Sequence, residues 1–116
     1  MTSNILADIK KMLGIEESSS EFDTDIVSAV NSAFFVLFQL GICLDAPFYV
    51  DDSTCWDDLT TTAPKMVIRD YVYLKVRLSF DPPGSSFVLD ALKERVSELE
   101  FRLNVQVDNG GGEIRG

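Results

Sequence analysis

A pair of prolines, Pro82 and Pro83, separates two strongly apolar helical patterns within residues 71–103. Proline has no backbone N–H and clashes with the preceding turn, so a helix cannot continue through two of them. The residue before a proline is pushed out of the helical region, which places the break at Asp81. Residues 84–86, Gly-Ser-Ser, then supply a turn and a hydroxyl N-cap. The sequence therefore predicts an αα-hairpin with a stiff structural corner at Pro82 and Pro83.

Helices are predicted on both sides of this corner. The first begins with Thr62 as cap and Pro64 in its first turn, and runs to about Phe80. The second runs from Ser86 to about Val105, and its apolar residues step by 3 and 4 as in a coiled-coil seam. These seam residues are Leu89, Leu92, Val96, Leu99 and Leu103. On the same helix Glu98 and Arg102 form a favourable i,i+4 pair, and Phe101 lies off the seam on the charged face.

The helix before the corner carries four cations, and two interpretations of them are possible. Four cations on one helix are able to contact phosphate, but an acidic chain favours pairing with its acidic loop or with a neighbour's carboxylates. We therefore expect ion pairs. The cations are Lys65, Arg69, Lys75 and Arg77.

Two further helices are predicted in the N-terminal part. The first spans Asn4–Leu13, with Ser3 as cap and Gly14 as its C-terminal stop. The second runs from Asp23 or Thr24 to Leu40 and ends at Gly41; apolar residues, Phe34 and Phe38 among them, go nearly all the way round it. Such a helix is buried on every side. Either it is the central core helix, or part of its surface meets a neighbouring subunit.

The connection over residues 42–62 is long and strongly acidic. Residues 48–50 are predicted to be extended, and residues 56–59 to form one helical turn. The segment has no basic residue, glycine or glutamate, which argues against a calcium loop. We interpret it as a solvated acidic loop with Trp56 as a protein-contact residue, because long ordered loops tend to be functional and tryptophan is enriched at interfaces. The aspartates are Asp45, Asp51, Asp52, Asp57 and Asp58.

The last residues differ from the rest in composition. Residues 106–116 are polar and glycine-rich, and alone they are expected to be flexible. We predict two parts: a helical domain over residues 1–105, and a C-terminal tail over residues 106–116 that is flexible or docks on a partner. The expected fold class is all-α, a small bundle of about four helices with a long acidic loop and an extended tail.

Composition excludes several classes of function. The 116 residues carry 10 Lys+Arg against 19 Asp+Glu, a net charge of −9, which disfavours binding to nucleic acid or an anionic membrane. No histidine is present, so His-dependent catalysis and most metal sites are absent, and we expect no cofactor and no metal. Cys43 and Cys55 lack metal-site spacing and are predicted to be buried thiols. No apolar run is long enough to span a bilayer, and no signal peptide is recognisable, so we expect a soluble protein that is not an enzyme.

The order of these pieces resembles the small head–tail connector, or adaptor, proteins of tailed bacteriophages. The matching segments are ILADIKKMLGI, FDTDIVSAVNSAFFVLFQLGI, the Trp56-Asp57-Asp58 turn, YVYLKVRLSFDPP and SSFVLDALKERVSELEFRLN. Together they cover nearly all of the chain up to about Val105. None of them is a catalytic signature, and the specificity lies in their order.

The resemblance implies a structural virion protein with no enzymatic activity. Family members form a homo-oligomeric ring of about twelve subunits beneath the portal protein, a closed assembly with one repeated heterologous interface. The ring extends the channel for double-stranded DNA, which passes without specific binding, and presents a platform for a stopper or tail-completion protein. The expected location is the virion neck, after synthesis in the host bacterial cytoplasm. A C-terminal segment commonly reaches the portal.

These interpretations single out two sets of candidate residues. The oligomer or partner interface candidates are Phe34, Phe38, Trp56, Phe101, Ile114 and Arg115. The candidates for channel or inter-subunit electrostatics are Asp51, Asp52, Asp57, Asp58 and Glu98. Either the carboxylates of the acidic loop or those of Glu94, Glu98 and Glu100 are expected to face the channel or a neighbouring subunit. The alternative function is a DNA-packaging accessory or small nucleic-acid-binding helical protein, which the basic helix before the corner supports.

Overall fold

The computed structural model describes residues 4–41, 47–61 and 63–115, with side chains as far as residue 104. This part of the chain forms four α-helices and one 3-10 turn: α1 (Ile5–Leu13), α2 (Asp23–Gln39), η1 (Trp56–Asp58), α3 (Lys65–Phe80) and α4 (Ser86–Arg115). Within those ranges no strand forms, and one isolated antiparallel bridge joins Asn4 to Cys55. The prediction of an all-α fold with four helices is confirmed.

Local sequence explains both ends of α1. The Asn4 side chain accepts a hydrogen bond from the backbone N–H of Ala7 at 2.9 Å, which satisfies one of the free donors of the first turn. Gly14 ends the helix at a φ of 80°, a left-handed conformation that glycine adopts without a steric penalty. The predicted stop at Gly14 is therefore confirmed, whereas the predicted cap, Ser3, lies outside the described residues.

A buried lysine fixes the segment between α1 and α2. The side chain of Lys10 is almost fully buried, and its Nζ lies 2.9 Å from Oδ1 of Asp23. The same ammonium donates to the backbone carbonyls of Glu17, at 3.0 Å, and of Ser19. A buried charge is tolerated when it is paired and hydrogen-bonded, so these contacts hold residues 14–22 against α1.

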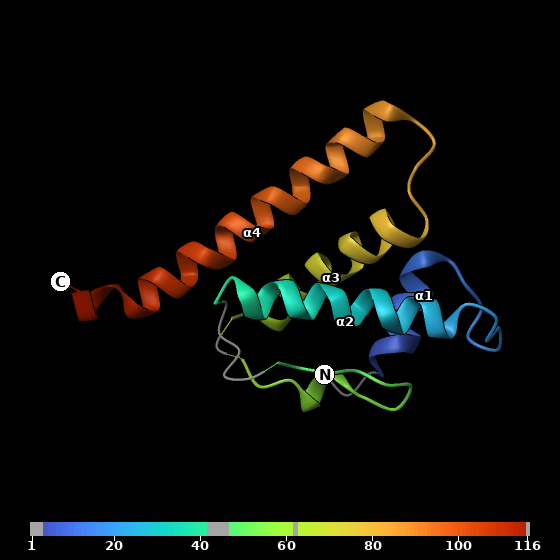
Figure 1. Ribbon diagram of the computed structural model, residues 1–116, viewed down its shortest axis with the longest axis horizontal. Coiled ribbons are helices and arrows are strands. Elements are labelled where there is room, and N and C mark those ends of the chain that lie inside the picture. Colours follow the sequence, from blue (N-terminus) through green and yellow to red (C-terminus); the bar gives the residue numbers. More distant parts are fainter. Residues whose placement is uncertain (1–3, 42–46, 62, 116) are drawn as a thin grey trace.

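The helix α3 lies at the centre of the molecule and contacts α1, α2 and α4. In Figure 1 α2 crosses in front of α3, and α4 rises along its other side. The aromatic rings of Phe22 and Phe80 meet edge to face at 5.3 Å where α2 begins and α3 ends. The buried residues of α3 are Ile68, Tyr71, Val72, Leu74 and Val76.

Only one side of α2 is buried. Its core-facing residues are Ile26, Val30, Ala33, Phe34 and Leu37. On the opposite side Phe35 and Leu40 are exposed, and Val36 and Phe38 are half-buried. The prediction that this helix is buried on every side is wrong for the single chain, because the other helices are too few to surround it.

The loop over residues 47–61 passes beneath α2 in Figure 1 and returns to α3. Asn31 on α2 holds it, because its side-chain amide donates to the carbonyl of Val50 at 3.0 Å and accepts from the N–H of Val50 at 2.6 Å. This paired contact imitates the pairing of two strands. The helical turn predicted at residues 56–59 is confirmed as η1.

The corner between α3 and α4 lies where the prolines predicted it, over residues 81–85. The backbone N–H of Val88 approaches Oγ of Ser85 at 3.4 Å, so a serine hydroxyl caps α4. Past the corner, α4 lies antiparallel to α3 and the two helices diverge toward the turn (Figure 1). As a result, the seam of α4 is buried at Val96, Leu99 and Leu103, but only half-buried at Leu89 and Leu92.

The backbone of α4 remains helical as far as Arg115. The predicted end of this helix near Val105 is therefore wrong, whereas a tail over residues 106–116 that is flexible or docks on a partner stays a prediction. The expected stop came from the three glycines at 110–112, each of which costs about 1 kcal/mol in a helix interior. Adding residues to an existing helix is easier than starting one, and α4 already has more than six turns, at about 3.6 residues per turn, before the first of these glycines.

Candidate functional site

A cluster of three side chains joins the loop to the helical core. The carboxylate of Asp8 on α1 accepts hydrogen bonds from Arg69 on α3, Nε to Oδ2 at 2.5 Å and Nη2 to Oδ1 at 3.1 Å. It also accepts one from Nε1 of Trp56 at 3.0 Å. The Arg69 guanidinium holds the pKa of Asp8 below its ordinary value, although burial opposes this shift. We call Asp8, Trp56 and Arg69 the Asp8 cluster.

The Asp8 cluster corrects the prediction made for the cations of α3. Arg69 pairs with α1, not with the acidic loop, and Arg77 approaches the hydroxyl of Tyr73 at 3.3 Å. Nothing in the local spacing revealed the first pair, because Asp8 and Arg69 are 61 residues apart. Trp56 and Arg69 each donate a hydrogen bond to Asp8, so the three side chains are engaged with one another. The cluster therefore supports folding and offers no free base or nucleophile.

The aspartates of the loop shape the loop itself. Oδ1 of Asp51 accepts hydrogen bonds from the N–H and hydroxyl of Ser53, each at 2.8 Å, and from the Thr54 hydroxyl at 3.0 Å. These bonds, led by the backbone N–H of Ser53, lower the pKa of Asp51. Asp58 accepts from the N–H of Cys55 at 2.8 Å and so caps η1. The side chains of Asp51, Asp52, Asp57 and Asp58 are exposed, and Asp45 lies outside the described residues.

Two of the expected interface residues are core residues of the single chain. Phe34 and Trp56 have exposed fractions of 0%, and their rings pack at 6.4 Å from one another. Phe34 also meets Phe48 edge to face at 4.9 Å. These two side chains therefore present no surface to a partner in this conformation, while Phe38 is half-buried.

The outer face of α4 carries the remaining described candidates. Phe101 is 69% exposed, as its place off the seam predicted. Glu98 is within reach of Arg95 at 2.9 Å and of Arg102 at 3.2 Å, so the predicted i,i+4 pair forms. Glu100 points inward instead and accepts a 2.7 Å hydrogen bond from the Tyr71 hydroxyl. Burial, with a contribution from Glu100, raises the pKa of Tyr71 far above its usual range. The side chains of Ile114 and Arg115 lie outside the described part.

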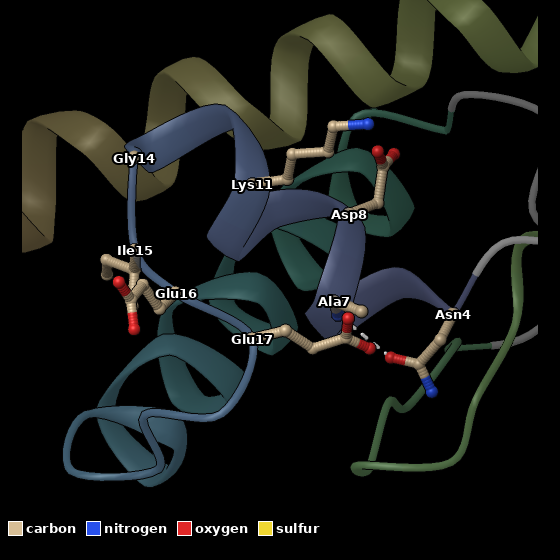
Figure 2. A pocket seen from close by; sticks show the side chains of 8 residues that line it. All are labelled: Asn4, Ala7, Asp8, Lys11, Gly14, Ile15, Glu16 and Glu17. Atoms are coloured by element: carbon tan, nitrogen blue, oxygen red, sulfur yellow. Dashed lines mark hydrogen bonds between the residues drawn. The ribbon is translucent and has the colours of Figure 1, made fainter.

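A shallow pocket of about 390 Å³ lies between α1 and the segment that follows it (Figure 2). Its lining carries one cation, Lys11, and the carboxylates of Asp8, Glu16 and Glu17. In Figure 2 the Asp8 carboxylate lies beside the Lys11 side chain, whereas Glu16 points away on the other side. The charged groups therefore do not converge on one point. Among the described residues no three His, Cys, Asp or Glu side chains are grouped to hold a metal ion.

Two open grooves flank α2. One, of about 530 Å³, lies toward the end of α3 and includes Phe22 and Phe80 in its lining. The other, of about 620 Å³, lies toward the loop and includes Phe35 and Tyr49. Both share Ser28 and Ser32, and between them they expose several large apolar side chains. The sequence indicated this surface only as an excess of apolar residues on α2.

Two other features were expected from the sequence. Cys55 is half-buried, not buried as predicted, and Cys43 lies outside the described residues. In the part of the chain that the structure describes, none of the helices combines the length and apolarity needed to cross a membrane.

Comparison with known proteins identifies the family. The model of the phage connector protein family matches residues 5–110, which span α1, α2, α3, the loop between α2 and α3, and α4 as far as residue 110. No curated protein and no solved structure shows a significant match to the chain. The matched family is one of structural proteins of the phage head–tail junction, not of enzymes. The chain, an all-α protein with exposed apolar surfaces and no converging catalytic groups in its described part, belongs to the phage connector protein family.

Proposed function

We propose that this chain is a ring-forming subunit of the phage neck that binds beneath the portal protein and extends the DNA channel. The observation that carries the proposal is the family match over residues 5–110. A connector joins the capsid and portal to tail proteins, so its partners are the portal above and a stopper or tail-completion protein below. The ring contains about twelve copies, because a closed cyclic assembly on a portal follows the portal's symmetry.

The surface of the folded chain supports repeated protein contacts. Tyr49, Met66, Phe87 and Phe101 remain more than half exposed after folding. Tyr49 lines a groove beside α2 together with the exposed Phe35, and large apolar side chains that gather in this way mark sites of protein–protein interaction. A ring subunit needs two such sites for its neighbours, as well as surfaces for the portal and for the next neck protein.

The charge of the chain supports a channel through which DNA passes freely. At a net charge of −9, the ring repels phosphate overall and does not retain the DNA. We propose that Asp52, Asp57, Glu94 and Glu98 contribute to this repulsion at the lumen or between neighbours. Glu100 is engaged by Tyr71 within its own chain, so it is a weaker candidate.

The position of α4 suggests where the portal binds. Leu103 is the last fully buried residue with a described side chain, yet the helix continues for twelve residues to Arg115. We propose that this C-terminal end, including Ile114 and Arg115, reaches the portal.

The first experiment is negative-stain electron microscopy of the chain with the portal protein encoded beside it, and of each protein alone. We expect a collar of extra density at the narrow end of the portal ring. A gel-shift assay with double-stranded DNA over a salt series tests the alternative packaging function. A chain that shifts DNA and leaves the portal bare would replace the connector proposal with that alternative, although the engagement of Arg69 by Asp8 weakens its structural basis.

A further inference from the structure

The outward side of α2 has the shape of a docking site for a helix. Ser28 and Ser32 form a low ridge between the two grooves of about 530 and 620 Å³. Small residues spaced four apart allow another helix to approach the backbone closely. Aromatic side chains border this ridge: Phe22 and Phe35 are exposed, and Tyr49 is 72% exposed. We call this region, built around Ser28 and Ser32, the α2 surface.

The beginning of α4 presents a face that its own chain covers only in part, through the packing of Leu92 against the core. Because α4 diverges from α3 toward the corner, Val88 is exposed and Leu92 is half-buried, whereas Leu99 farther along is 3% exposed. Val88, Ala91, Leu92 and Arg95 have i, i+3, i+4 and i+7 spacing, the pattern of a helix that enters a groove. We call these four residues the α4 face. In Figure 1 the helix α3 lies between α4 and α2, so the α4 face cannot reach its own α2 surface.

The charges of these two regions are complementary. Asp25 lines the groove of about 530 Å³ and is the one charged residue there, while the lining of the groove of about 620 Å³ contains no charged residue. The one charged residue of the α4 face is Arg95, whose half-exposed side chain lies 2.9 Å from Glu98. Arg102 lies 3.2 Å from the same carboxylate, so this group of three side chains carries a net positive charge. At 100° per residue Asp90 and Glu94 lie on the other side of α4, away from this face. A helix that brings Arg95 toward Asp25 therefore places unlike charges together at the edge of an apolar contact.

We propose that the α4 face of one copy packs on the α2 surface of the next copy. This inference rests on the proposed function, because a closed ring requires each subunit to carry two different, complementary surfaces. The α4 face of each copy contacts a different surface, the α2 surface, on the next copy. The contact is therefore heterologous and repeats around the ring. Phe34 and Trp56, which the sequence predicted to be interface residues, are buried in the core and do not take part in this contact.

Site-specific cross-linking tests this contact in the full chain. Cys43→Ser and Cys55→Ser provide a background without thiols, into which Ser28→Cys and Ala91→Cys are introduced together. A short bismaleimide applied to portal-bound collars should give a ladder of covalent oligomers, while either cysteine alone should give monomers. The matched control combines Ser28→Cys with Ser97→Cys, because Ser97 is exposed on the side of α4 opposite Val88.

Each result separates the inference from the proposed function. A ladder with Ala91→Cys and none with Ser97→Cys supports the contact. Collars without a ladder, or equal ladders from both pairs, overturn the contact and leave the connector function standing. A ladder in solution with no collar on the portal supports the contact between copies but overturns the portal-binding function, and the absence of both overturns both.

A charge exchange provides an independent measurement. Asp25→Arg and Arg95→Asp should each lower the association constant between subunits about tenfold, and the double variant should restore it within about threefold, as expected for an exposed pair. Circular dichroism of each variant verifies that the helices remain folded. If the double variant assembles no better than the worse single variant, Asp25 and Arg95 do not meet and the proposed register is wrong.

Discussion

Asp8 shows how one side chain connects three segments of this fold. It accepts hydrogen bonds from Trp56 and from two nitrogens of Arg69, and both of these residues lie outside its own helix α1. The side chain of Asp8 is 11% exposed, so removal of its charge leaves Arg69 and the indole N–H of Trp56 without a full complement of acceptors. The residue thus determines how the loop sits against α1 and α3.

We predict that Asp8→Asn lowers the free energy of unfolding by about 2 kcal/mol at pH 7, the scale for hydrogen bonds to a charged group. Urea denaturation measures the change. The matched control is Asp90→Asn, an exposed carboxylate on α4, which should change stability by less than about 0.5 kcal/mol. Similar losses in both variants would show that the Asp8 cluster contributes little.

The same carboxylate predicts a pH dependence. Its pKa in the folded chain lies below the ordinary value of 3.8, so the unfolded chain takes up this proton first as the pH falls. The contribution of Asp8 to stability is therefore complete above about pH 5 and is lost as the pH falls through the lowered pKa. Denaturation at a series of pH values from 6 to about 2.5 should show a shallower loss in Asp8→Asn than in the unchanged chain. Parallel profiles would contradict this assignment.

At the scale of elements, α4 combines two environments. Its middle packs on α3, where Val96, Leu99 and Leu103 are buried and Glu100 meets Tyr71. Its first end projects beyond this contact, and Phe87 there is 81% exposed. The helix therefore contributes to folding through its middle and leaves apolar surface uncovered at its first end.

Leu99→Ala and Phe101→Ser separate these two contributions. The first creates a cavity against α3 and should cost about 2–4 kcal/mol, while the second alters an exposed ring and should change stability by less than about 0.5 kcal/mol. Thermal unfolding measured by circular dichroism gives both values. Phe101→Ser is further expected to weaken assembly, which sedimentation velocity detects in mixtures with the portal. Equal thermal destabilisation by the two substitutions would show that the seam is assigned to the wrong face.

Removal of residues 106–116 tests the proposed portal contact. The last described buried side chain is Leu103, so the shortened chain should keep its melting temperature within a few degrees, which corresponds to about 0.5–1 kcal/mol. Its binding to the portal should be lost. A full-length chain with Ile114→Ser and Arg115→Glu is the matched control for effects of length, and it should bind weakly. Normal collars from the shortened chain would place the portal contact elsewhere.

At the scale of the whole molecule, the structure decides which carboxylates are available to act on DNA. Asp51 and Asp58 hold the backbone of the loop, and Asp8 and Glu100 are engaged by other helices. A substitution at any of these four residues would remove a hydrogen bond of the fold as well as a negative charge, so its effect on DNA could not be assigned to charge alone. Asp52 and Glu94 have exposed side chains on different segments, so they permit a test of charge alone.

We predict that Asp52→Lys combined with Glu94→Lys slows DNA ejection from assembled particles. Each reversal adds two units, so the subunit charge changes from −9 to −5 and the ring acquires cations that attract phosphate. Ejection followed by release of DNA to a fluorescent dye measures the rate. The pair Asp52→Asn and Glu94→Gln is the control, because it removes charge without adding cations. If assembly and ejection match the unchanged particle, the electrostatic part of the proposal is wrong.

The sequence by itself determined the features that depend on neighbouring residues. Backbone chemistry at Pro82 and Pro83 predicted the corner, and a φ of 80° at Gly14 agrees with the predicted helix stop. The spacing of the α4 seam identified Leu99 and Leu103 as buried residues. Such rules act over a single turn or a few residues, so they need no knowledge of where the other helices lie.

Tertiary structure alone decided which apolar and charged side chains have partners. Composition indicated a surplus of apolar residues on α2, but only packing against α3 and the loop buried Phe34 and left Phe35 exposed. Likewise, the pairing of Asp8 with Arg69 joins residues 61 positions apart, and the divergence of α4 from α3 leaves the side chain of Val88 exposed. These outcomes depend on the relative placement of whole helices, which is set by the sum of many contacts and not by any local pattern.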